Sequence, residues 1–245
     1  MIHPESAVVL GLLAALWVAA WRAVGGPLPR ARAAVFAVGL AGLALALNGP
    51  VHALAEHPLI AAHMGQHLLL TLVAPPALLA GTPGPMLDRL LAPLLRHRPA
   101  AAALRGLTRP LPALGLHGGA MILWHLPAFY ALTLASEAWH LTAHLTLVAT
   151  AGLAWWPVLS GSRRVPALPP AGQILYLFVF GFPMTLVGAL VTGAADLLYP
   201  TASPTPLEDQ RLGGILMWVP AGAIPLVAFS VVFFRWARSE LTTEP

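Results

Sequence analysis

The sequence predicts an all-α membrane protein, a polytopic bundle of seven transmembrane helices that forms a single transmembrane domain over residues 1–245. The first observation is composition: 58% of the residues are hydrophobic and 9% are charged, and the mean hydropathy is +0.77. A soluble domain carries about 25% charged residues. The second observation is a series of apolar runs, each near the ~20 residues that a helix needs to cross a bilayer. The third is that arginines recur in alternate connections between these runs.

Seven segments are long and apolar enough to span a membrane. They are approximately residues 7–24, 33–50, 59–80, 111–134, 138–159, 171–195 and 212–236. Several prolines fall inside or near the ends of these segments, for example Pro75, Pro76 and Pro127. Membrane helices tolerate such kinks when neighbouring helices satisfy the freed backbone groups.

The arginines predict the orientation of the bundle. All thirteen basic residues are arginine, and twelve of them fall in the first, third and fifth connections or in the carboxyl-terminal tail. Only Arg211 lies on the other side, where six of the nine acidic residues also fall. The positive-inside rule therefore predicts an amino terminus outside and a carboxyl terminus inside.

The long inner connection, residues 81–110, contains a helical pattern of its own. Its leucines recur at i, i+3, i+4, i+7 and i+8, which is typical of one apolar helix face, at positions 87, 90, 91, 94 and 95. Because arginines flank this pattern, we expect a helix near 85–105 that lies on the cytoplasmic membrane surface. The same pattern also fits a docking helix for a partner protein.

Composition excludes several classes of function. The chain contains no cysteine, which rules out disulfides, thiolate metal sites, iron–sulfur clusters and thiol catalysis. The net charge of +4 comes from arginines scattered among loops between apolar runs, so topology explains it and no nucleic-acid partner is expected.

Histidines gather at the outer side of the predicted bundle. Eight of the ten belong to outer loops or outer halves of spans, and four of these form two His-x-x-x-His pairs, His63/His67 and His140/His144. Residues i and i+4 stack on the same face of a helix. An imidazole in a bilayer is costly without a partner, so a group of them predicts a functional site.

The two pairs and His125 fall in one shallow layer. At about 1.5 Å per residue, His67 lies roughly 12 Å, His144 roughly 9 Å and His125 roughly 13 Å from the outer ends of their spans. Five imidazoles from three helices predict a metal site. Met64, Met121 and Met217 lie near this layer, and imidazole with thioether suits copper, particularly Cu(I), better than cations that prefer oxygen. Zinc is the second choice.

Other interpretations of the histidines stay open. They could form a hydrogen-bonded network that packs helices together, or a proton relay. A seven-span zinc-dependent membrane hydrolase would need a base such as Glu137 or Asp209, because HMGQH lacks the Glu of H-E-x-x-H. A haem-binding membrane protein could use facing histidines. A transporter has little support, since no broken-helix repeat or charged pathway crosses the inner half and His117 alone is too little. His3, His52 and His57 could form a loop entry site, and Asp209 and Gln210 most simply cap their own helix.

Four stretches resemble the membrane-integral CtaG-like family of bacterial cytochrome c oxidase assembly factors. They are HMGQHLLLTLVAPPALLAGTP (63–83), WHLPAFY (124–130), WHLTAHLTLVATAGLAWWPVL (139–159) and LEDQRLGGILMWVP (207–220). Together they cover most of the chain from the third predicted helix onward. One departure is Ala131, at a position where the family pattern has an acid.

The resemblance implies a role in oxidase maturation linked to copper supply, in the bacterial plasma membrane. It implies metal-ligand roles for His63, His67, His125, His140 and His144. Our leading hypothesis is a non-enzymatic metallochaperone that binds copper at the periplasmic face and delivers it to a cytochrome c oxidase subunit. A soluble copper chaperone is expected to feed the site.

Overall fold

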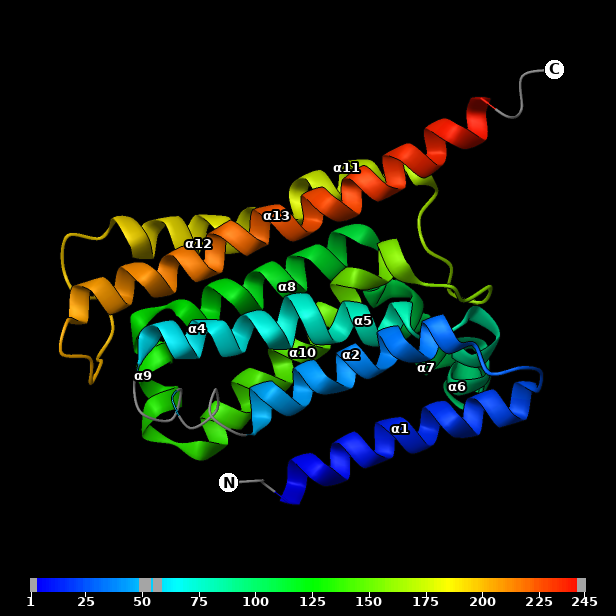
Figure 1. Ribbon diagram of the computed structural model, residues 1–245, viewed down its shortest axis with the longest axis horizontal. Coiled ribbons are helices and arrows are strands. Elements are labelled where there is room, and N and C mark those ends of the chain that lie inside the picture. Colours follow the sequence, from blue (N-terminus) through cyan, green and yellow to red (C-terminus); the bar gives the residue numbers. More distant parts are fainter. Residues whose placement is uncertain (1–3, 49–53, 55–58, 242–245) are drawn as a thin grey trace.

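The computed structural model describes residues 4–48, 54 and 59–241, and in these ranges its regular elements are all helices (Figure 1). The helices are α1 (Pro4–Val24), α2 (Arg30–Leu47), α4 (Ile60–Leu68), the π-helical turn η1 (Leu69–Val73), α5 (Ala74–Ala80), α6 (Gly84–Arg96), α7 (Arg98–Leu107), α8 (Pro110–His125), α9 (Pro127–Ala135), α10 (Glu137–Leu159), α11 (Pro170–Phe180), α12 (Phe182–Gly193) and α13 (Pro206–Leu241). The long helices run side by side, with the two ends of the chain at opposite ends of the bundle (Figure 1).

The helices fit a multi-pass membrane protein. Among the described residues five helices are long and apolar enough to cross a bilayer, and up to seven if each of two bent helix pairs is one span. The bundle also exposes large apolar side chains, such as Leu111 at 80% and Phe178 at 69%. Lipid chains are the medium in which such a surface is stable, since the backbone polar groups are satisfied inside the helices.

Two predicted helices are each broken in two, and in both cases a proline explains the break. The prediction of a single surface helix near 85–105 is wrong. Helix α6 ends at Arg96, His97 is extended, and α7 begins at Arg98, just before Pro99. The predicted fourth span bends by 73° between α8 and α9, where Leu126 precedes Pro127 with φ −66° and ψ 134°. Leu126 directly precedes a proline, which pushes a residue from the helical to the extended region. Pro99 has no N–H for the carbonyl of Leu95, four residues earlier, so it fits only in the first turn of a new helix.

The third span contains a different adjustment to proline. Pro75 has no N–H to donate to the carbonyl of Thr71, four residues earlier. The chain widens here into the π turn η1, in which the N–H of Ala74 reaches back five residues to the carbonyl of Leu69. The indole Nε1 of Trp155 on α10 donates to the orphaned Thr71 carbonyl at 3.1 Å. A neighbouring helix thus supplies the hydrogen bond that proline removes.

Asp209 on α13 caps another helix and not its own, contrary to the sequence interpretation. Its two carboxylate oxygens accept the backbone N–H groups of Ile60 at 2.8 Å and Ala61 at 3.1 Å, the first residues of α4. The hydroxyl of Thr201 donates to the same carboxylate at 2.6 Å. Negative charge at a helix amino terminus satisfies free N–H groups and the helix dipole. Asp209 therefore holds the start of α4 against α13.

Gln210, the neighbouring residue, forms hydrogen bonds with the loop between α12 and α13. Its side-chain amide donates to the carbonyl of Asp196 at 3.1 Å, and its side-chain oxygen accepts the N–H of Leu198 at 2.6 Å. The residue is fully buried. Two hydrogen bonds to backbone groups explain how a polar amide is buried here without cost.

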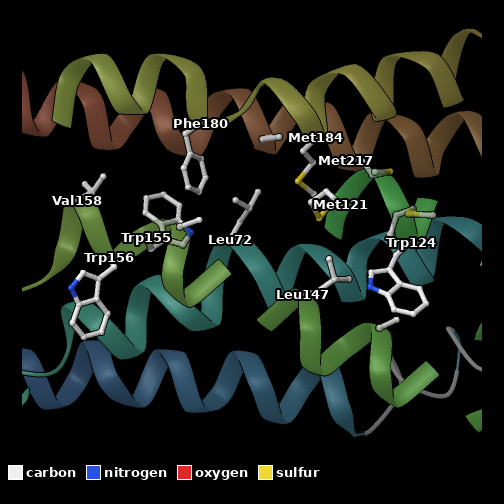
Figure 2. Close-up of a cluster of buried hydrophobic side chains, with 14 of the residues drawn as sticks. Leu72, Met121, Trp124, Leu147, Trp155, Trp156, Val158, Phe180, Met184 and Met217 are labelled. Carbon is white, nitrogen blue, oxygen red and sulfur yellow. The ribbon is translucent and has the colours of Figure 1, made fainter. Parts of the chain in front are cut away.

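The interior is apolar and joins α4, η1, α8, α10, α11, α12 and α13. Figure 2 shows two zones of this core, one with Trp155, Trp156 and Phe180 and one with Met121, Met184 and Met217. Helices α12 and α13 cross closely because Gly188 and Gly214 carry no side chain at the crossing: a Cβ on Gly214 would lie 2.7 Å from the backbone nitrogen of Thr192.

At the end of the bundle opposite α9, the carboxylate of Asp88 on α6 forms hydrogen bonds with the loop 160–165. It accepts the Ser162 hydroxyl at 2.5 Å and the N–H groups of Arg163 at 3.3 Å and Arg164 at 3.4 Å. Partial burial acts to raise the pKa of Asp88, but these donors and the charge of Arg164 outweigh it and lower the pKa from its ordinary value of 3.8.

Replacing Asp88 with asparagine is expected to lower the free energy of unfolding by about 1 kcal/mol at pH 7, because charge-assisted hydrogen bonds are lost. The folded-state pKa is below the unfolded one, so this contribution is fully present above pH 3.8 and is lost as the pH falls through the folded pKa. Thermal denaturation in detergent against pH checks this, with Asp196→Asn, an exposed aspartate, as the control. Equal shifts at all pH values would contradict it.

Candidate metal centre

The five predicted metal ligands come from three neighbouring helices at one end of the bundle. His63 and His67 are on α4, His125 ends α8, and His140 and His144 are in the first turns of α10. All are buried except His140, which is half-buried. In Figure 1 this is the end at which α4 begins and α9 lies, away from α6 and α7.

The rings of these histidines contact one another in a continuous cluster, which we call the imidazole cluster (His63, His67, His125, His140 and His144). Within the helices, the ring centroids of His63 and His67 are 4.3 Å apart and those of His140 and His144 are 4.2 Å apart. Between helices, His63 is 5.6 Å from His140 and His67 is 5.6 Å from His144. His67 is also 5.2 Å from His125.

The hydrogen bonds of His125 define which nitrogen of His67 carries the proton. His125 Nδ1 lies 2.6 Å from the carbonyl of Met121, so it must be the protonated nitrogen. Its Nε2 is then an acceptor, and His67 Nδ1, 3.3 Å away, donates to it. The lone pair of His67 is therefore on Nε2. Both nitrogens of His125 are engaged, one as donor and one as acceptor.

Two nitrogen atoms of α4 are buried without a hydrogen-bond partner, Nδ1 of His63 and Nε2 of His67. Buried polar atoms are nearly always paired, so such exceptions need an explanation. A bound ion is one explanation, because the neutral imidazole nitrogen is the commonest metal ligand in proteins. In His67 the hydrogen bond to His125 leaves the lone pair on the unpartnered atom.

The cluster is near a coordination geometry without having reached it. Among residues 4–48, 54 and 59–241, no three His, Asp or Glu side chains are already placed to hold an ion. Metal–nitrogen bonds of about 2.0–2.1 Å would put the ring centroids of two ligands on a tetrahedral ion about 5 Å apart. The pairs between α4 and α10, at 5.6 Å and, for His63 and His144, at 6.3 Å, are wider than this, and the pairs within helices are closer. The rings would therefore have to shift before they could share an ion.

Two tyrosines belong to the site and were not singled out from the sequence. The ring of Tyr130 on α9 packs edge-on against His63 at 5.1 Å, and its hydroxyl is buried without a hydrogen-bond partner. The ring of Tyr199 packs against that of Tyr130 at 4.5 Å with a tilt of 44°, and its hydroxyl donates to the carbonyl of His125 at 2.6 Å. The chain has only three tyrosines, and one of them five residues after His125 was the available signal.

The other residues that the sequence associated with this site are not part of the ring cluster. His3, His52 and His57 lie outside the described residues. Met64, Met121 and Met217 are completely buried in the apolar core. His117 is also buried, and its Nδ1 lies 3.2 Å from the hydroxyl of Thr150.

Comparison with known proteins identifies the family. No curated protein and no solved structure matches the chain. A family described as cytochrome c oxidase caa3 assembly factor (Caa3_CtaG) matches residues 12–239, a range that includes every helix of the imidazole cluster. The chain therefore belongs to the cytochrome c oxidase caa3 assembly factors.

Proposed function

We propose that this assembly factor binds copper in the imidazole cluster at the outer face of the membrane and delivers it to a subunit of the oxidase. The observation that carries the proposal is the pair of buried nitrogens without hydrogen-bond partners, His63 Nδ1 and His67 Nε2, within a group of five imidazoles. The absence of cysteine leaves imidazole and thioether as the soft donors in the chain.

The donors have different roles in this proposal. His63, His67, His140 and His144 are the ligands, two from α4 and two from α10. His125 accepts a hydrogen bond from His67 and so orients its ring, as an outer hydrogen-bond acceptor commonly does for a metal-bound histidine. The sequence analysis included His125 among the ligands, but both its nitrogens already have partners, which favours the orienting role.

Delivery in this proposal is an exchange of ligands that leaves the oxidation state of copper unchanged. Each imidazole that leaves the ion is replaced by a donor atom of the recipient subunit. The position of the cluster supports the outer face: it lies at the end of the bundle away from α6 and α7 (Figure 1), and α6 and α7 carry arginines that favour the cytoplasmic side.

Two alternatives, a zinc hydrolase and a haem-binding protein, have less support. A zinc hydrolase needs a free carboxylate as its base. Both oxygens of Asp209 are occupied by the amide groups of α4, which leaves Glu137, an exposed residue at the start of α10. A haem would need a flat slot between facing imidazoles. His67 instead forms a hydrogen bond with His125 at 3.3 Å and packs against His63.

The first test is the metal content of the purified protein. We expect the wild type, loaded anaerobically with Cu(I), to retain copper at the cluster, and the variant with His63, His67, His140 and His144 all replaced by alanine to lose it. His97→Ala, which removes an exposed histidine from the α6–α7 junction, is the matched control. Imidazole nitrogen scattering in the copper X-ray absorption spectrum should fall with the quadruple variant. Equal copper and equal nitrogen scattering in both proteins would reject the proposal.

The second test separates His125 from the ligands. His125→Phe keeps a ring of similar size but removes the acceptor for His67 Nδ1. Loss of such an outer partner typically costs 10–100-fold in metal affinity, so we expect weaker Cu(I) binding in competition with a chelator at unchanged stoichiometry. A lost equivalent of copper and one fewer imidazole in the absorption spectrum would instead make His125 a ligand.

A further inference from the structure

A small cavity lies deeper in the bundle, on the inner side of the imidazole cluster. Its volume is about 10 Å³, room for about one water-sized sphere. Its wall includes the side chains of His117 and Met121 from α8 and Met184 from α12. These three residues are 4%, 0% and 4% exposed, so the donor-bearing wall of the cavity is buried.

The hydrogen bonds of His117 make its Nε2 a donor atom for a ligand. The hydroxyl of Thr150 uses its proton on the carbonyl of Thr146, at 2.7 Å. It must therefore accept from His117 Nδ1, 3.2 Å away, which places the proton of the imidazole on Nδ1. The lone pair is then on Nε2.

The remaining wall selects for a soft ion. Besides the imidazole and the two thioethers, the cavity is lined by apolar residues, including Leu72 and Phe180, and by no carboxylate or amide side chain. Hard cations such as Ca²⁺ and Mg²⁺ need several oxygen ligands. Imidazole with two thioethers suits Cu(I), and its single positive charge is the least costly to bury in this core. Figure 2 shows Met217 beside Met121 and Met184 as a further thioether of this zone.

Helix α8 contributes residues both to the wall of the cavity and to the imidazole cluster. His117, Met121 and His125 are spaced four residues apart and so share one face of α8. At 1.5 Å per residue, Met121 is about 6 Å and His117 about 12 Å further along the axis than His125. The carbonyl of Met121 also accepts the N–H of His125, so the backbone of this turn links the two groups of donors.

We propose that His117, Met121 and Met184 form a second binding site, for Cu(I), about 6–12 Å deeper in the membrane than the imidazole cluster. This thioether site depends on its own donors and does not require that the imidazole cluster binds copper. Two soft sites on one face of α8 would let the protein hold a second ion behind the one that it delivers.

The experiment is copper X-ray absorption on the full-length protein in detergent, loaded anaerobically with Cu(I) alone. We expect sulfur scattering at about 2.3 Å in the wild type and in the quadruple alanine variant of the imidazole cluster. Met121→Leu/Met184→Leu should lose this sulfur signal and one equivalent of Cu(I), and His117→Phe should lose the same equivalent. Met86→Leu, a buried methionine on α6 in a different part of the core, is the control.

Selenomethionine labelling gives a readout that needs no substitution. Labelled protein should show copper–selenium scattering, which the double leucine variant should remove. Absence of sulfur and selenium scattering in the wild type would overturn the proposal, and so would scattering that the double variant leaves unchanged. Loss of copper only in the quadruple alanine variant would overturn the thioether site and support the imidazole cluster, whereas the opposite result would do the reverse.

Discussion

Replacing Asp209 with alanine is expected to destabilise the protein by about 2–4 kcal/mol, since hydrogen bonds to a charged group contribute about 1.5–3 kcal/mol each and do not add fully. The carboxylate holds the N–H groups of Ile60 and Ala61, and no residue within α4 can replace it at the amino terminus of that helix. The first turn of α4 should then fray from α13.

The same substitution should weaken copper binding about tenfold, because a metal affinity falls when the elements that orient its ligands loosen. His63 lies in the first turn of α4, two residues after Ala61, so its ring position depends on the contact with Asp209. Asp209→Asn keeps one acceptor oxygen and should fall between the wild type and the alanine variant.

Thermal denaturation and Cu(I) competition measure both effects. Glu208→Ala is the matched control, because Glu208 is an exposed acid one position away in the same first turn of α13. If Asp209→Ala and Glu208→Ala behave alike, the contact between α13 and α4 has no energetic importance.

A methyl group on Gly214 is expected to separate α12 from α13. The new Cβ would lie 2.7 Å from the nitrogen of Thr192 and 2.8 Å from the carbonyl oxygen of Gly188, both backbone atoms that cannot rotate away. Overpacking typically costs 1–3 kcal/mol, and we expect about 3 kcal/mol here because helix backbones must move.

Gly222→Ala on the same helix is the control for this prediction. Nothing lies within 4 Å of a Cβ at Gly222, and alanine is favoured over glycine in a helix by about 1 kcal/mol. The two variants should therefore shift the melting temperature in opposite directions. A stabilised Gly214→Ala protein would show that the two helices can separate without loss.

The sequence was sufficient for features that depend on spacing along one helix. Four-residue spacing predicts that His63 and His67 share a face, and the structure has their ring centroids 4.3 Å apart. Hydropathy predicted an all-helical membrane protein, and the family resemblance that rested on four motifs is confirmed over residues 12–239.

Features that depend on contacts between helices could not be predicted in this way. Asp209 was expected to cap its own helix, since sequence distance favours that choice, but in the folded chain α4 brings its free N–H groups to the carboxylate. The roles of the nitrogens of His67 and His125 depend on a bond between α4 and α8. Pro99 and Pro127 were visible, yet whether each proline kinks or breaks a helix is decided by packing.

The π turn η1 also has a consequence for how the third span is phased. A π turn holds one residue more than an α turn, and each residue rotates a helix by about 100°. The rings of His63 and His67 on α4 meet those of His140 and His144 on α10, whereas α5 packs against α2, and these two faces are therefore set independently, although both belong to one continuous span. Without the extra residue, a span in which α5 kept its packing would turn His63 and His67 about 100° away from His140 and His144. One surplus residue beside Pro75 thus decides where two of the imidazoles face.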